Sequence, residues 1–169
     1  MTTKEDTLPF LIVDTREQTP LPFANLQAER GTLTSGDYSV KGLEGRFAVE
    51  RKTVADIIGS LTGERERFER ECHRLRGYDF ARLLIVGQPG DIALHLRRRK
   101  TSVKAIQGSL GTLEARYRLP VVWEPTPESA ALRVEKWAWW YYREALRPFR
   151  RLTTPDFAGQ PQHLTPTKP

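Results

Sequence analysis

The sequence predicts an α/β fold in which a mixed β-sheet is flanked by helices. Short apolar runs, at positions 10–13 and 82–86, are typical of strands buried in a core. From residue 54 onward, apolar residues recur instead with the i, i+3, i+4, i+7 spacing of one helix face. Strands that alternate with helices in the second half of the chain favour a sheet with helices packed on it.

The first part of the chain is predicted to consist of strands and turns. The run at 10–13 ends at Asp14, and residues 15–23 form a loop because two prolines and several polar residues interrupt any periodicity. Within residues 32–40, Ser35-Gly36-Asp37 predicts a turn between two short strands. A hairpin connection at 42–46 then leads to a strand at 47–49.

Helices are predicted to dominate from residue 54 onward. Two helices are followed by a strand at 82–86, a short helix at 91–96, a long helix capped by Ser102, a strand at 120–123 and a final helix at 127–146. The apolar faces of the first three longer helices consist of Val54, Ile57, Ile58 and Leu61, of Phe68, Cys72 and Leu75, and of Val103, Ile106, Leu110, Leu113 and Tyr117.

Length and composition narrow the class of protein. The 169 residues favour one domain, which we expect at 1–147, followed by a flexible, proline-rich C-terminal tail at 148–169. No run approaches the ~18 apolar residues of a membrane span, and the N-terminus has no apolar signal core. A single cysteine excludes an internal disulfide. We therefore expect a cytoplasmic protein without a membrane partner.

The chain is basic, with a formal net charge of +6. An excess of Lys and Arg favours a polyanionic partner such as nucleic acid, because opposite charge steers association. Solvated surface cations are the alternative explanation, so the charge supports DNA only in combination with other features.

Glu50-Arg51-Lys52 stands where the strand at 47–49 runs into a helix. Side chains alternate across a strand, so Glu50 and Lys52 should lie on one face of the sheet and Arg51 on the other. A carboxylate beside an amine suits metal-assisted phosphodiester cleavage. The carboxylate holds a divalent cation, and the amine orients the attacking water, helps to deprotonate it or offsets phosphate charge. Oxygen donors favour Mg²⁺ or Mn²⁺ over zinc.

Further acids stand at neighbouring strand ends and turns. Asp14 and Asp37 do so directly, and Glu17 and Asp56 are close in sequence. Each acid taken singly is also compatible with a solvated turn or a loop cap. The pattern alone therefore leaves two alternatives, a metal-dependent nuclease and a set of solvated charged turns.

Three segments carry a resemblance to a known family: VDTRE, GDYSV and VERKTVADIIGSL. They are similar to the nuclease domain of the XPF-type structure-specific endonucleases, the excision-repair cross-complementing family. The family signature is GD, a variable stretch, ERK, three residues and D, which here corresponds to Gly36-Asp37, Glu50-Arg51-Lys52 and Asp56. The resemblance continues through ERERFERECHRL and SVKAIQGSLGTLEARYRLPVVW, and implies a stand-alone nuclease domain with a restriction-endonuclease-like core.

The resemblance implies a Mg²⁺- or Mn²⁺-dependent endonuclease that cleaves branched or structured DNA, such as a flap, fork or junction. Its products would carry 5′-phosphate and 3′-hydroxyl ends. By the same resemblance Asp14, Asp37 and Glu50 are the expected metal ligands, with Glu17 assisting. Lys52 would serve the attacking water. The expected catalytic set is Asp14, Glu17, Asp37, Glu50, Arg51, Lys52 and Asp56.

Basic residues outside this set are expected to contact DNA. Arg97 and Arg98 precede the helix that begins near Ser102, and a cationic loop before free helix N–H groups suits a phosphate. A solvated charge run is an equal alternative there. Arg67 with Phe68 resembles an Arg-aromatic pair of the family. The full expected set is Arg16, Arg67, Arg97, Arg98 and Lys104.

The segment KWAWWYY of the final helix predicts an interface. At about 100° per residue, Trp137 and Tyr141 face the sheet, Trp139 points almost opposite, and Trp140 and Tyr142 lie on the flanks. One helix face cannot bury five aromatic side chains, and family relatives pair through helices of this region. We therefore expect a homodimer with Trp139, Trp140 and Tyr142 at its interface. An isolated exposed tryptophan is the alternative.

Two other functions fit the sequence. One is a non-catalytic DNA-binding partner subunit of a heteromeric nuclease, although an intact set of acids with Lys52 argues against it. The other is a restriction-like nuclease that reads DNA sequence. The helicase and tandem helix-hairpin-helix regions of larger relatives are absent from this sequence. We therefore expect the protein in a bacterial or phage-infected cell. We also expect a helicase or another repair, recombination or replication protein as a partner.

Overall fold

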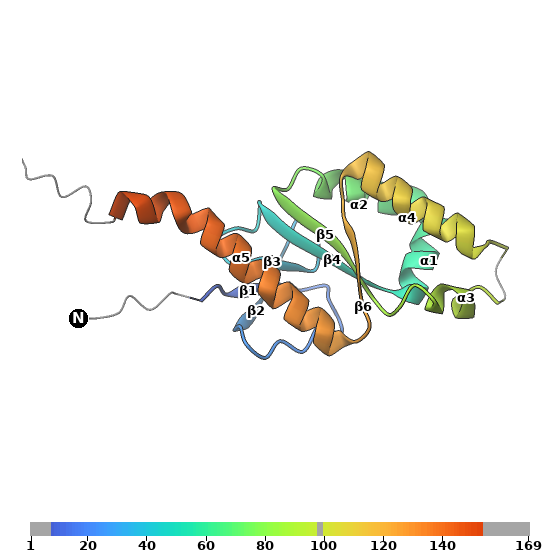
Figure 1. Cartoon of the computed structure of the whole chain (residues 1–169), viewed down its shortest axis with the longest axis horizontal. Helices are drawn as coiled ribbons and strands as arrows, with labels where there is room; N and C mark the ends of the chain where they lie inside the picture. Colours follow the sequence, from blue (N-terminus) through green and yellow to red (C-terminus); the bar gives the residue numbers. More distant parts are fainter. Residues whose placement is uncertain (1–7, 98–99, 154–169) are drawn as a thin grey trace, which may run out of the picture.

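The computed structural model describes residues 8–97 and 100–153, with the side chains of 150–153 left aside, and builds one mixed sheet between two helical layers (Figure 1). Parallel pairing joins β1 to β2 and joins β4, β5 and β6, whereas β3 runs antiparallel to both β1 and β4. The predicted mixed sheet is thereby confirmed. In spatial order the strands are β2 (Ala28–Gly31), β1 (Leu11–Asp14), β3 (Tyr38–Val40), β4 (Phe47–Thr53), β5 (Phe80–Val86) and β6 (Val121–Glu124).

Each face of the sheet buries its own apolar cluster. Ala48, Leu83 and Ile85 contribute to the cluster under four helices, and Phe47 and Leu84 to the cluster under the fifth. Successive side chains of β4 and β5 therefore alternate between two cores, as the period of a strand requires. The four helices are α1 (Val54–Thr62), α2 (Arg65–Leu75), α3 (Asp91–His95) and α4 (Val103–Tyr117), and the fifth is α5 (Pro127–Thr153).

Two predicted element positions were wrong. The strand expected after Thr32 lies at Ala28–Gly31, because β2 is an exposed edge strand that is defined by its pairing with β1 and not by an apolar pattern. Helix α5 continues beyond residue 146 to Thr153 and contains Pro148. Its C-terminal end projects past the sheet (Figure 1), so no apolar periodicity accompanies it. The remainder of the predicted tail, 154–169, lies outside the described residues, and the division at 147 stays a prediction.

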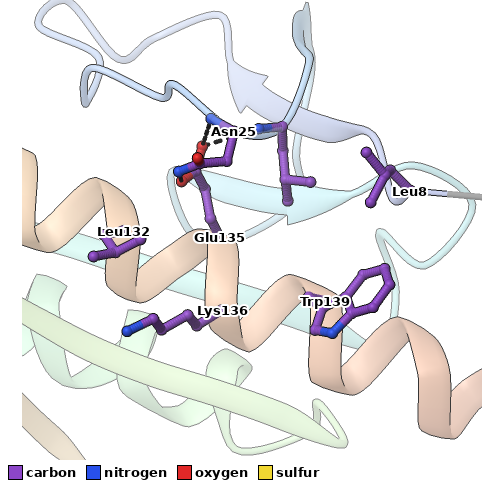
Figure 2. A pocket seen from close by; sticks show the side chains of 7 residues that line it. Leu8, Asn25, Leu132, Glu135, Lys136 and Trp139 are labelled. Atoms are coloured by element: carbon purple, nitrogen blue, oxygen red, sulfur yellow. Dashed lines mark hydrogen bonds between the residues drawn. The ribbon is translucent and has the colours of Figure 1, made fainter.

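Trp139 does not point away from the molecule as expected. Its ring is half-buried and lines a groove of about 290 Å³ between α5 and the connection that precedes β2 (Figure 2). Glu135, one turn earlier, is buried and accepts backbone hydrogen bonds from Ala24, Asn25 and Leu26, which holds this connection against the helix. Trp140 is the exposed tryptophan instead, with 61% of its surface accessible.

None of the helices formed by the described residues combines the length and the apolar composition needed to cross a membrane.

Gly36 forms the turn of the backbone directly before Asp37. Its φ is +80°, and a Cβ at this position would lie 3.1 Å from the carbonyl oxygen of Val49 and 3.3 Å from Cβ of Ala48. The next N–H, that of Asp37, donates to the same Val49 oxygen at 2.8 Å. The turn thus needs both a left-handed backbone and the absence of a side chain, which only glycine provides without strain.

Replacing Gly36 by alanine should cost more than the same change at Gly42. Gly42 has nearly the same φ, +81°, but a Cβ added there would have no atom within 4 Å, so Gly42→Ala measures backbone strain alone. We expect urea denaturation to show a loss of about 1 kcal/mol for Gly42→Ala and of about 2–3 kcal/mol for Gly36→Ala. Equal losses would show that the contact with Val49 relaxes without cost.

Candidate active site

Three acids lie in a row across three adjacent strands. The registers of β1 with β3 and of β3 with β4, each continued by one residue, place Asp14 beside Asp37 and Asp37 beside Glu50. The N–H of Asp14 donates to the backbone carbonyl of Asp37 at 2.8 Å. Glu50 follows Ala48 by two residues and therefore faces the α1–α4 side of the sheet.

Glu50 and Lys52 form a largely buried ion pair at the end of β4. Lys52 Nζ lies 2.7 Å from Glu50 Oε1, and only 15% and 6% of the two side chains are exposed. The same Nζ is 5.0 Å from the centre of the Phe68 ring on α2, a favourable position for a cation over an aromatic face.

Arg51 points to the opposite face of the sheet. Its Nη2 donates to the carbonyl of Thr19 at 2.9 Å, and its Nη1 is 3.9 Å from Glu17 Oε2. The predicted alternation of the Glu-Arg-Lys trio across β4 is confirmed. Arg51 supports the site through its backbone, because its N–H donates to Asp37 Oδ2 at 2.7 Å.

The environment of Asp37 and Glu50 disfavours two negative charges. Burial raises the pKa of each carboxyl above its ordinary value. The charge of Asp37 raises the pKa of Glu50 further, and the charge of Glu17 does so for Asp37. Such mutual repulsion in a poorly solvated place is relieved by a bound cation.

The neighbouring carboxylates favour the protonated form of Lys52. Burial acts to lower its pKa, but the carboxylates of Glu50, Glu71 and Asp37 outweigh burial and raise the pKa above the ordinary lysine value. A protonated amine donates hydrogen bonds and offsets negative charge, whereas it cannot accept a proton. Of the three roles open to Lys52, orienting water and stabilising phosphate charge fit this environment.

Asp37 and Glu50 provide donor atoms suited to a hard divalent cation. Asp37 Oδ1 and Glu50 Oε2 accept no hydrogen bond from any residue in the described part of the chain. One buried and one half-buried carboxylate that repel each other, with a free oxygen each, fit Mg²⁺ or Mn²⁺. Within residues 8–97 and 100–153, no three acidic, His or Cys side chains converge closely enough to hold a metal together.

The Asp14 carboxylate forms its hydrogen bonds with residues outside the Asp37–Glu50 pair. Its Oδ1 accepts from Arg16 Nε at 2.6 Å, and its Oδ2 accepts from the N–H of Leu33 at 2.7 Å. Burial alone would raise the pKa of Asp14, but these bonds and a further one from the Arg16 N–H lower it below the ordinary value. The structure therefore brings Asp37, Glu50 and Lys52 together and holds the Asp14 carboxylate on Arg16.

Glu17 and Asp56 lie at the margins of this centre. Glu17 Oε1 accepts the N–H of Thr19 at 2.8 Å. Asp56 is exposed in the first turn of α1, where its Oδ2 accepts from Thr53 Oγ1 at 2.7 Å and its N–H donates to the same oxygen at 3.1 Å. This exchange caps the helix, so Asp56 orients the end of β4 rather than facing Asp37.

The basic residues expected to bind DNA are exposed wherever they are described. Arg16 also donates to the carbonyl of Leu33 at 2.9 Å, and Arg67 pairs with Glu64 at 3.1 Å. Arg97 follows α3, and Lys104 lies in the first turn of α4, whose N-cap is Ser102. Arg98 lies outside the described residues.

Glu71 on α2 was missed by sequence reasoning. It is half-buried, and its charge acts on Asp37, Glu50 and Lys52. The signal in the sequence was its position three residues after Phe68, which places it on the same face of α2. The charged neighbours of Glu71 on that helix concealed this signal.

The raised pKa of Asp37 predicts how stability depends on pH. The folded state binds this proton more tightly than the unfolded chain, so stability should fall as pH rises from the ordinary carboxyl range, about 4, through the raised pKa. Asp37→Asn removes the charge and keeps an oxygen for the Arg51 N–H. In metal-free buffer at pH 8 we expect it to raise the free energy of unfolding by about 1–3 kcal/mol.

Denaturation at several pH values checks this, and the measurement at pH 4 is the internal control, because both proteins are then neutral at residue 37. A variant that is less stable than the parent at pH 8 would contradict the assignment of an ionised, destabilising Asp37.

Comparisons with known proteins show a matching domain family and a shared fold. The model of the ERCC4 domain family matches residues 13–133. A comparison with curated proteins finds no match.

Among solved structures, XPF from Aeropyrum pernix superimposes with a TM-score of 0.64 at 23% identity, covering 95% of this chain and 68% of that one. XPF from Aeropyrum pernix in complex with DNA gives a TM-score of 0.63 at 24% identity, covering 83% and 66%. The present chain thus spans about two thirds of the length of these structures, and the likeness shows that the fold is shared.

Proposed function

The chain belongs to the ERCC4 domain family of structure-specific DNA nucleases, and from this premise we propose that it is a divalent-metal-dependent DNA endonuclease with its centre at Asp37, Glu50 and Lys52. The observation that carries the proposal is the buried Lys52–Glu50 pair, 2.7 Å apart, beside Asp37. Structural pairs need no repelling acid next to them, whereas metal-assisted hydrolysis does.

Asp37 and Glu50 would hold the cation, which is Mg²⁺ or Mn²⁺ in this proposal. The chemistry that such a cation supplies is a lowered pKa of water and neutralisation of phosphate charge. The N–H of Arg51 fixes the Asp37 carboxylate, and Glu50 fixes the ammonium of Lys52. Lys52 then has donor protons to orient a water and to stabilise negative charge that develops on the phosphate.

Branched or structured DNA is the proposed substrate, cleaved to 5′-phosphate and 3′-hydroxyl ends. Support for DNA as the partner comes from the basic chain and from the relative of similar fold that was solved with DNA. Arg16, Arg67, Arg97 and Lys104 are exposed and are proposed to bind the backbone phosphates. A cytoplasmic location and a helicase partner stay predictions.

A panel of flap, fork, four-way and linear duplex DNA tests this function. With Mg²⁺ or Mn²⁺, the protein should cut branched substrates faster than linear duplex. Asp37→Asn and Glu50→Gln should eliminate cleavage, because each removes a proposed ligand charge, and Lys52→Ala should slow single-turnover cleavage by about 10²–10⁴-fold.

Added Mn²⁺ should raise the melting temperature of the parent and not of Asp37→Asn, whether or not DNA is cut.

The two alternative functions would give other results in the cleavage panel. A protein that binds branched DNA but cuts nothing would be the non-catalytic subunit. Cleavage of linear duplex at one sequence would identify a restriction-like enzyme.

We further propose a homodimer through α5, on the face of the sheet opposite the centre. Trp140 is exposed, and Trp139 and Leu132 line the neighbouring groove. Tyr142 packs partly on the core, so it lies at the margin of this surface. Arg143 lies 5.3 Å from the Trp139 ring and 5.9 Å from the Trp140 ring, which keeps a cation close to both. A two-fold contact would bury Trp140 from both chains.

Light scattering at micromolar concentration should report about twice the monomer mass, and Trp140→Glu should halve it because a buried charge without a partner opposes association. Leu94→Glu is the matched control, since Leu94 is also exposed but lies on α3. A monomeric parent at all micromolar concentrations would refute the homodimer.

A further inference from the structure

Helix α2 closes over the catalytic centre at two points. The Phe68 ring lies 5.0 Å from Lys52 Nζ. Two turns later, Arg74 Nε donates to the hydroxyl of Ser35 at 3.2 Å. Ser35 is buried in the turn that leads to Asp37, so α2 spans from the end of β4 to the start of β3.

Glu71 lies midway between these two contacts. It follows Phe68 by three residues and precedes Arg74 by three, and residues three apart share a helix face. Glu71 must therefore face the space between Lys52 and the turn at Ser35. It is half-buried and forms no hydrogen bond or ion pair with another residue of the described ranges. Glu69, on the same helix, is by contrast paired with Arg65 at 2.9 Å.

Electrostatics support this position. The charge of Glu71 raises the pKa of Asp37, of Glu50 and of Lys52. It also acts on Arg16, which borders the centre from the side of β1. These groups belong to β4, to the turn before β3 and to the segment after β1, which agrees with a place for Glu71 on the side of α2 that covers the centre.

We infer that Glu71 is a positioning residue that holds the Lys52 ammonium from the α2 side, opposite Glu50. The inference rests on the proposed function of the centre. An ammonium has three donor protons. Glu50 accepts one of them, Glu71 provides an acceptor for a second through a bridging water, and the third is left for the substrate phosphate. Phe68 covers the remaining side of the amine.

Single-turnover cleavage at saturating DNA and metal tests the role of this carboxylate. Glu71→Ala should lower the rate by about 10–100-fold, and Glu71→Asp should recover most of it, because the shorter side chain keeps the charge. Glu66→Ala is the matched control. Glu66 is an exposed acid on the same helix, and its loss should change the rate by less than about twofold.

A double-mutant cycle separates an action through Lys52 from an action on the metal ligands. If Glu71 works by positioning Lys52, Glu71→Ala should have no further effect in the Lys52→Ala background. Equal fold losses in both backgrounds would overturn the inference, as would a Glu71→Ala variant as active as Glu66→Ala.

A measurement that does not depend on DNA cleavage can test the position of Glu71 separately from the proposed function. In ¹⁵N-lysine NMR of the whole chain, the Nζ signal of Lys52, assigned by its loss in Lys52→Ala, should shift or broaden in Glu71→Ala and stay unchanged in Glu66→Ala. If the parent cuts no DNA, the proposed function fails while this comparison still decides the inference. An unchanged Lys52 signal in a folded Glu71→Ala variant would refute it.

Discussion

Half-buried Asp37 and buried Glu50 lie side by side at the point where β3 begins and β4 ends, and the repulsion between their charges is what the surrounding structure has to balance. Removing two carboxylates from water costs free energy unless hydrogen bonds and opposite charges compensate. The Arg51 N–H and the Lys52 ammonium supply part of that compensation. In the proposed function a cation would relieve the repulsion that remains, so the feature that costs stability is also the one that would favour metal binding.

Strand β4 divides the chemistry of the protein between two faces. Glu50 and Lys52 face α1–α4, while Arg51 reaches Thr19 and the Glu17 carboxylate on the other side. Because the period of a strand is two, shifting this strand by one residue would exchange the two sets. The apolar cores above and below β4 therefore fix the register of Glu50, Arg51 and Lys52 as well as stabilising the sheet.

Much of this arrangement was predictable from the sequence because it follows from local periodicity. Apolar runs located the central strands, helical spacing located α1, α2 and α4, and alternation placed Glu50 and Lys52 on one face. The features that could not be predicted depend on contacts between residues that are far apart in the sequence. Strand β2 exists through pairing with β1, Asp14 is turned by Arg16 and Leu33, and Trp139 is covered by a connection anchored on Glu135. Local sequence gives no periodic signal for such contacts. Glu71 was missed for a different reason, because the charged residues around it on α2 concealed its helical spacing from Phe68.

The connection between β1 and β2 is held by hydrogen bonds near both of its ends. Near one end, the carbonyl of Thr19 binds Arg51, whose backbone holds Asp37; near the other, three successive N–H groups bind Glu135 on α5. Few residues with free backbone rotation separate these two sets of hydrogen bonds. The segment therefore forms a short link between the outer helix and the backbone that holds Asp37. Any sliding of α5 along the sheet would pull on that link, so the two surfaces of the domain are mechanically linked although a whole sheet separates them.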